Sequence, residues 1–180
     1  MLLSLKILVL DDDKKAFRSP VVSRNRMEYL WSADRKMVAE CDKCQPMFSG
    51  EIGDNCTCGL YSSPNFEAIA EYDNGKYAVI CLLNLYGKVD IWYGPEGKMT
   101  WAYQTYGDLR HTFICRSWGA RIVAVVDRSD DTGMQSHDRN IAMTTAAEIL
   151  NVPVFGKGLA TAMIDKTWMD TLGYKPERKE

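Results

Sequence analysis

Apolar runs of strand length alternate with polar segments along most of the chain, and helical periodicity is confined to its last third. The run at residues 1–10 is almost wholly apolar and ends in three acidic residues, which predicts a buried first strand. Residues 66–77 predict a short helix or turn that leads into the next strand. From there to residue 106, β-branched and aromatic residues flank a Gly-Pro-Glu-Gly turn at 94–97, which indicates a β-hairpin.

Two more β-rich runs follow, at 110–115 and 121–127, and the second resembles a fully buried strand. After a polar loop at 128–139, two amphipathic helices are predicted. The apolar face of the first is formed by Ile141, Ala142, Thr145, Ala146, Ile149 and Leu150, and its end is marked by Asn151 and Pro153. The face of the second is formed by Leu159, Met163, Ile164, Trp168 and Leu172.

This pattern predicts an α+β fold in a single domain spanning residues 1–180. We expect a mainly antiparallel sheet or a partly open barrel, with a zinc-bound loop at about 38–62. Two C-terminal helices make up a helical part at about 138–174. The aromatic content of 11% and apolar content of 46% exclude a disordered chain.

Charge is mildly uneven along the chain. The formal net charge of -2 argues against a protein that binds polyanions over its whole surface. Residues 14–43, however, carry eight basic and four acidic side chains, whereas residues 45–100 carry three basic and seven acidic ones. A local basic patch is therefore compatible with the composition.

No segment approaches the roughly 20 apolar residues that a membrane-spanning helix needs. The opening residues contain Lys6 and run into acidic residues without a small-residue cleavage site, so a first strand fits them better than a targeting signal. The expected location is cytoplasmic.

Four of the six cysteines are clustered within eighteen residues, as Cys41-x2-Cys44 and Cys56-x-Cys58. Without a secretion signal, this clustering favours a metal over disulfides. Four thiolates form a closed tetrahedral ligand set, so the expected ion is a structural zinc with no open position for catalysis. The alternative is free thiols or a disulfide. Cys81 and Cys115 lie in apolar runs and are expected to be buried structural cysteines.

Sequence motifs for catalysis are missing: there is no phosphate-binding glycine loop, zinc-protease helix motif or serine-hydrolase elbow. His111 and Cys115 share a strand face, but at about 13 Å apart they are too distant for a nucleophile–base pair. An enzymatic alternative would place a nucleotide-directed site around His111, Asp127 and His137. It requires these three side chains to meet in one pocket.

Nucleic-acid binding is suggested by the basic segment next to the cysteine loop. Arg18 and Arg24 would contact phosphates, while Trp31 and Tyr61 would stack on unpaired bases. The alternative is that Trp31 and Tyr61 pack against the zinc loop.

One set of residues resembles a group of small uncharacterised proteins of actinobacteria and their phages. The resemblance lies in the Ser-Pro of residues 17–22, Trp31, Ala-Glu-Cys at 39–41 and Cys-Thr-Cys-Gly-Leu-Tyr from residue 56, and it continues more weakly at 85–89 and 151–155. The group usually has a histidine where this chain has Cys44, a change that preserves a four-ligand zinc site. The resemblance implies kinship of fold and brings no activity with it.

Three functions follow as hypotheses. The first is a zinc-stabilised, non-enzymatic binding module, in one version phage-encoded, for a nucleic acid, a nucleotide or a host protein. The second is the nucleotide-acting enzyme described above. The third is an assembly protein that docks through the helix at 159–172, with Trp168 as its anchor.

Overall fold

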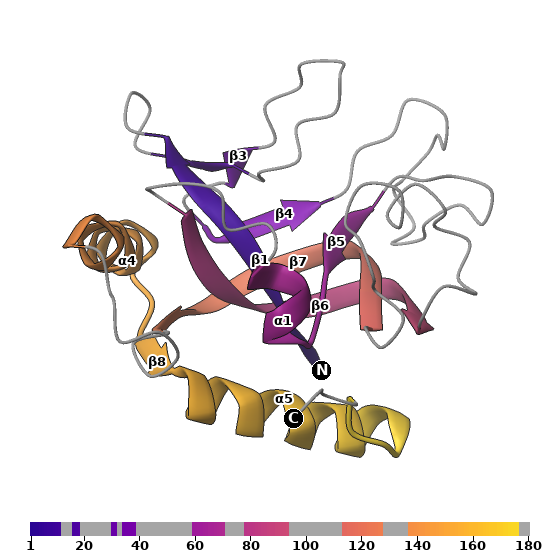
Figure 1. The fold of residues 1–180 in the computed structure, drawn as a ribbon. Coiled ribbons are helices and arrows are strands. Elements are labelled where there is room, and N and C mark those ends of the chain that lie inside the picture. The colour runs from indigo at the N-terminus through magenta and orange to yellow at the C-terminus, as the bar shows by residue number, and fades with distance from the viewer. Residues whose placement is uncertain are drawn as a thin grey trace.

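The computed structural model describes residues 1–11, 16–18, 30–31, 34–38, 59–70, 78–93, 113–127 and 137–176. Within these ranges the chain forms eight strands and three helices (Figure 1). The strands are β1 (Leu2–Asp11), β2 (Ala16–Arg18), β3 (Leu30–Trp31), β4 (Lys36–Val38), β5 (Leu60–Ser62), β6 (Ala78–Tyr93), β7 (Phe113–Asp127) and β8 (Val154–Gly156). The helices are α1 (Phe66–Ala70), α4 (His137–Leu150) and α5 (Lys157–Leu172).

All eight strands belong to one open sheet, whose main order is β3-β2-β1-β6-β7-β4. Every pairing is antiparallel except that of β7 with β8. The predicted α+β class, the mainly antiparallel sheet and the two C-terminal helices are therefore confirmed. Most of the loop expected to bind zinc lies outside the described residues.

The two longest strands, β6 and β7, lie side by side in the sheet. Their pairing shifts register twice, between Leu82 and Leu83 and between Tyr86 and Val89, and Gly87 takes a positive φ of 74° within the second shift. Such bulges increase local twist and bend the strands. The other edge of β7 is lined in turn by β5, β4 and β8. One more contact, a pair of backbone hydrogen bonds of 2.7 and 2.9 Å between Leu5 and Ser63, joins β1 to the end of β5.

The predicted strands agree with the structure in part. The first strand, the short helix after residue 66 and the strand that follows it are confirmed as β1, α1 and β6. Two β-rich runs, expected to be separate, form the single strand β7, because the residues between them also pair with β6 on both sides of the bulge at Trp118. The described partners of β6 are β1 and β7, and the predicted turn at 94–97 lies outside the described residues.

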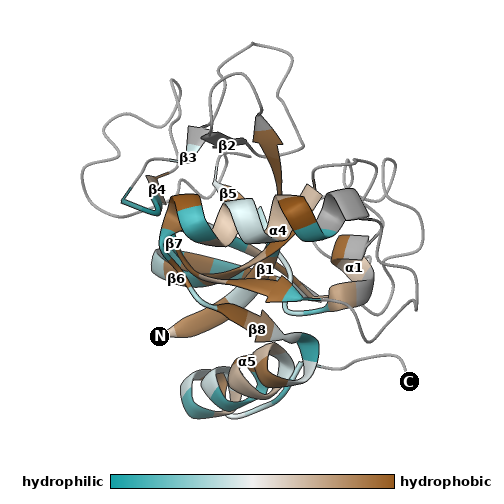
Figure 2. Cartoon of the chain, turned by 90° about the vertical axis from the view of Figure 1, so that its left-hand side faces the viewer, coloured by the Kyte–Doolittle hydropathy of each residue, from teal (hydrophilic) through white to brown (hydrophobic). Residues whose placement is uncertain are grey.

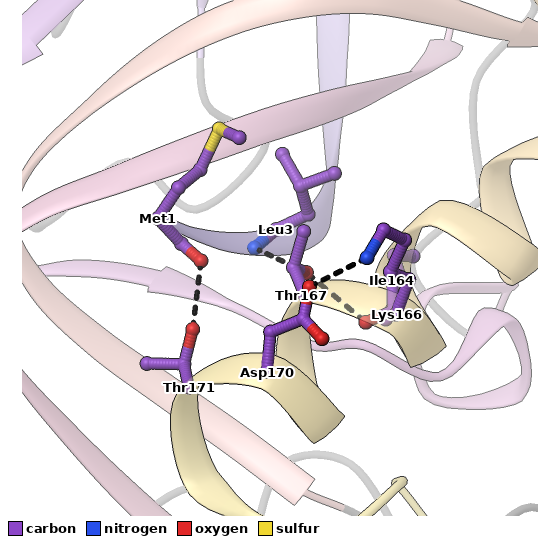
Figure 3. A network of polar contacts seen from close by, with 7 residues as sticks. All are labelled: Met1, Leu3, Ile164, Lys166, Thr167, Asp170 and Thr171. Atoms are coloured by element: carbon purple, nitrogen blue, oxygen red, sulfur yellow. Dashed lines mark hydrogen bonds and ion pairs between the residues drawn. The ribbon is translucent and has the colours of Figure 1, made fainter.

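Helix α5 lies against the N-terminal end of β1 (Figure 3). The amide of Leu3 donates to Thr167 Oγ1 at 3.2 Å, and the hydroxyl of Thr171 donates to the carbonyl of Met1 at 3.0 Å. Gly173 ends the helix with a left-handed φ of 80°, and its amide bonds to the carbonyl of Met169. These bonds fix the helix along the sheet.

Trp168 is the central apolar contact of α5, and it is fully buried. Its indole N–H donates to the Leu3 carbonyl at 2.8 Å, and its ring packs edge-on against Phe113 at 5.3 Å between centroids. The suggestion that Trp168 anchors a partner is therefore wrong, since the side chain already fills the core of its own protein.

Helix α4 is confirmed, but the face that it buries against the sheet is rotated about the helix axis from the predicted apolar face. Ala142, Ala146 and Leu150 are buried, whereas Ile141 and Ile149 of the predicted face are 49% and 38% exposed. The central strands of the sheet are largely hydrophobic, while both long helices carry mixed surfaces (Figure 2). Small alanines allow a helix to approach the sheet closely, and this packing outweighs the larger apolar area of the isoleucines. Asn151, with φ of 48°, ends the helix as expected.

Candidate functional site

The predicted zinc ligands Cys41, Cys44, Cys56 and Cys58 lie outside the described residues, so the zinc site stays a prediction. Among the residues that the structure does describe, no group of three His, Cys, Asp or Glu side chains could hold a metal ion. Cys81 and Cys115 are free and fully buried, as expected. Burial raises the pKa of each thiol to about 12, and the nearby Ser4 hydroxyl offsets this effect slightly at Cys115. Both thiols are therefore protonated and unreactive at neutral pH.

Of the residues predicted to bind nucleic acid, the structure describes the side chains of Trp31 and Tyr61. Trp31 is 4% exposed and belongs to the hydrophobic core, which leaves no ring face for an unpaired base. Tyr61 is half-buried on β5, which pairs with β7, whereas Trp31 lies on β3, which pairs with β2. Arg18 ends β2, and Arg24 lies outside the described part of the chain.

The predicted enzymatic site cannot be assembled from the described residues. Asp127 ends β7, where it pairs with Gly156 of β8, and His137 begins α4. His111 lies outside the described ranges. The convergence of the three side chains stays a prediction.

A half-buried polar cluster lies where the chain leaves the cysteine loop. Arg116 on β7 is 5% exposed and lies between Tyr61 of β5 and Asp90 of β6. Its Nε donates to Asp90 Oδ2 at 3.1 Å, Nη2 bonds to the same oxygen, and its guanidinium lies 5.2 Å from the centre of the Trp92 ring. This ion pair and cation–π contact neutralise and cover a charge that would otherwise be costly to bury.

Gly59, the residue after Cys58 in the sequence, packs directly on the stem of Arg116. A Cβ atom at Gly59 would lie 2.5 Å from Arg116 Cγ, and the φ of Gly59 is 131°. Only glycine tolerates both conditions. The close packing against Arg116 was not predicted from the sequence. The end of the cysteine loop is thereby fixed to β7.

A second cluster, which we call the cationic face, is formed by Lys36, Val38, Asn84, Tyr86 and Arg121. Lys36 on β4 lies directly opposite Arg121 on β7, which in turn lies opposite Asn84 on β6. Lys36 and Arg121 are exposed, Val38 is 38% exposed, and Asn84 and Tyr86 are partly buried. The face is therefore open to solvent at its cationic end.

Opposed positive charges make this face unusual. Residues directly opposite in an antiparallel pair have Cβ atoms about 5 Å apart, and like charges there destabilise the sheet. Within the described part of the chain, the guanidinium of Arg121 has no ion-pair partner. The register therefore places two cations directly opposite each other at this point of the sheet, with the carboxylate of Asp34 two residues before Lys36 in the chain.

Tyr86 lies on the same face of the sheet as these cations. Its ring lies over Gly119, where a Cβ atom would come within 2.3 Å of the ring, and its hydroxyl donates to the Met37 carbonyl at 3.3 Å. Trp118 packs against it in an edge-on geometry, with centroids 5.8 Å apart. Burial, together with the nearby negative charge of Asp34, raises the pKa of Tyr86, so its hydroxyl remains a neutral donor at physiological pH.

The chemistry of this face suits binding rather than bond breaking. It offers two exposed cations, one side-chain amide and one aromatic ring, which are groups that contact phosphates and flat ligands. Sequence reasoning missed Arg121 and Tyr86. The only sequence signal was an arginine at the start of an otherwise apolar strand, and its proximity to Lys36 depends on strand register.

Among the helices that the structure describes, none is long and apolar enough to cross a membrane. Comparisons with protein-family models, with curated proteins and with solved structures give no match to this chain.

Proposed function

We propose that this protein is a zinc-stabilised, non-enzymatic binding module whose cationic face binds the phosphate groups of a nucleic acid. The observation that carries the proposal is the opposition of Lys36 and Arg121 on an exposed part of the sheet. Two exposed cations at directly opposed positions favour the binding of an anionic group such as a phosphate. The nearby ring of Tyr86 adds a surface on which a base or sugar can pack.

The zinc ion has a structural role in this proposal. Four cysteine thiolates satisfy its coordination, and the loop that carries them ends at Gly59, which is held against Arg116. Binding of zinc would therefore fix the loop immediately before β5. The close fit of Gly59 supports an ordered connection at this point.

Binding is tested by fluorescence anisotropy with labelled 20-nucleotide single strands and a matching duplex, over a range of KCl concentrations. We expect Arg121→Gln and Lys36→Gln each to weaken binding. Each should also reduce the slope of log Kobs against log salt by roughly 0.7 for single strands or 0.9 for duplex DNA, as one phosphate contact is lost. The matched control is Lys166→Gln, which removes an exposed cation from α5 that is paired with Asp170.

Stability distinguishes loss of binding from loss of fold. Because Arg121→Gln removes a like-charge repulsion, its free energy of unfolding should equal or slightly exceed that of the wild type. Wild-type protein that fails to bind either nucleic acid at 50 mM KCl would refute the proposal. Equal weakening by Lys166→Gln would show that the cationic face is not the site.

Zinc is tested by native mass spectrometry of protein purified from cells. We expect one zinc ion per chain, and its removal by a chelator should be accompanied by loss of folded structure. Cys56→Ser should lose the metal and stability together, whereas Cys81→Ala should retain the metal. Metal-free protein with four reactive thiols in the cysteine loop would refute the zinc site.

A further inference from the structure

A cluster of small polar side chains lies inside the curled sheet, away from the cationic face. Ser4 and Lys6 project from one face of β1, since they are two residues apart. Lys6 lies opposite Cys81 on β6, and the bridge between Leu5 and Ser63 places Lys6 beside Ser62 on β5. Four strands thus contribute to the cluster once β7 is included.

The contribution of β7 is Cys115. It lies opposite Ser62 in the register of β5 and β7, and its thiol interacts with the hydroxyl of Ser4. Ser4, Cys81 and Cys115 are fully buried, Ser62 is 8% exposed, and Lys6 is partly buried. The register therefore brings two hydroxyls, two thiols and one amine to the same side of the sheet.

The hydrogen bonding of this cluster is incomplete. Ser62 Oγ has no hydrogen-bond partner within the part of the chain that the structure describes, and the same holds for Ser4 Oγ apart from its interaction with the Cys115 thiol. Lys6 Nζ donates to the Tyr61 carbonyl at 2.8 Å, which uses one of the three donors of an ammonium group. A buried hydroxyl without a partner is destabilising, and such groups in proteins are normally satisfied by protein or by ordered water.

We propose that Ser4, Lys6 and Ser62 form an internal site for an ordered water molecule that bridges the two hydroxyls and the amine. Each hydroxyl has one donor and two acceptor positions, and water can supply both kinds of partner. A monatomic anion would accept hydrogen bonds from these groups but give none to the hydroxyl oxygens. The thiols of Cys81 and Cys115 stay protonated, so they add no charge that would select a cation.

The site also explains how a lysine is accommodated here. No described carboxylate forms an ion pair with Lys6. A bridging water would accept one of the two ammonium hydrogens that Tyr61 leaves over, and it would couple β1 to β5 beneath the end of the cysteine loop. This inference is independent of nucleic-acid and zinc binding.

The test uses the full-length protein and water itself as the probe. Intermolecular NOEs between water and the protons of Ser4 and Ser62 should show a residence time longer than the tumbling time of the protein. Magnetic relaxation dispersion of 2H and 17O should lose roughly one long-lived water in the Ser4→Ala/Ser62→Ala double variant. The matched control is Ser117→Ala, which removes an equally buried hydroxyl that has an internal acceptor, the Leu60 carbonyl at 3.5 Å.

Two results would overturn the inference. The first is the absence of long-lived water contacts to Ser4 and Ser62 in the wild type, a measurement that holds even if the double variant fails to fold. The second is bromide found between Lys6 and the two serines by anomalous scattering, which would identify an anion site instead. Loss of the dispersion signal in Ser117→Ala as well would assign the water elsewhere.

Discussion

Lys6 gives the sharpest quantitative prediction from this structure. The side chain projects from β1 into the sheet, and burial lowers its pKa from 10.5 to about 8. The titratable side chains that face it are the thiols of Cys81 from β6 and Cys115 from β7, both with pKa values near 12. Between pH 7 and pH 10, Lys6 is therefore the member of this cluster that changes its charge.

The sign of the effect follows from proton linkage. Below pH 8 the amine is charged in both states, and burying it destabilises the folded protein to the full extent. As pH rises from 8 to 10.5, the folded state loses the proton first, so stability increases, and above 10.5 the penalty is gone. Lowering the pKa from 10.5 to about 8 destabilises the folded state by about 3 kcal/mol at pH 7 and by about 1.5 kcal/mol at pH 9.5.

The variant Lys6→Met removes the charge and keeps much of the side-chain volume. It also leaves the Tyr61 carbonyl without its 2.8 Å hydrogen bond, which adds a pH-independent destabilisation of about 1–3 kcal/mol. The diagnostic quantity is therefore the change with pH. Between pH 7 and pH 9.5, the free energy of unfolding of the wild type should rise by about 2 kcal/mol relative to that of the variant.

The assay is urea unfolding followed by circular dichroism at several pH values, with equal m-values as the check that both proteins unfold alike. Lys166→Met, which removes an exposed lysine from α5, should track the wild type at every pH. Parallel stability curves for the wild type and Lys6→Met would refute the reasoning. They would mean that the amine is as well solvated in the folded state as in the unfolded chain.

Three further variants test individual contacts by the same unfolding assay. Trp168→Phe should lower the free energy of unfolding by about 2 kcal/mol, because it removes the hydrogen bond to the Leu3 carbonyl and part of a fully buried ring. A loss as small as that expected for a tryptophan on the surface would contradict this packing. Gly59→Ala should cost about 2 kcal/mol or more through its φ of 131° and its clash with Arg116, and a neutral result would mean that this backbone relaxes freely. Asp90→Asn should cost about 2 kcal/mol by leaving the guanidinium of Arg116 without its counter-charge, whereas Arg116→Met should be less destabilising than Asp90→Asn if the buried charge is the cause.

The local elements followed from the sequence because their signals are local. The apolar run before Asp11 could only be stable as a buried strand, and the helix before Asn151 and Pro153 ends where backbone chemistry requires it. Trp168 was placed correctly on the apolar face of its helix. Whether that face met its own sheet or a partner could not be known, because periodicity identifies a face and not its neighbour.

The sequence alone determined the fold class, most of the long elements and a four-cysteine pattern suited to zinc. Tertiary structure alone decided which residues face one another. The opposition of Lys36 and Arg121, and the cluster of Ser4, Lys6 and Ser62, depend on register between strands that are far apart in the chain. A shift of one residue would turn each of these side chains to the other face of the sheet, so it is the packing of the whole core that selects them.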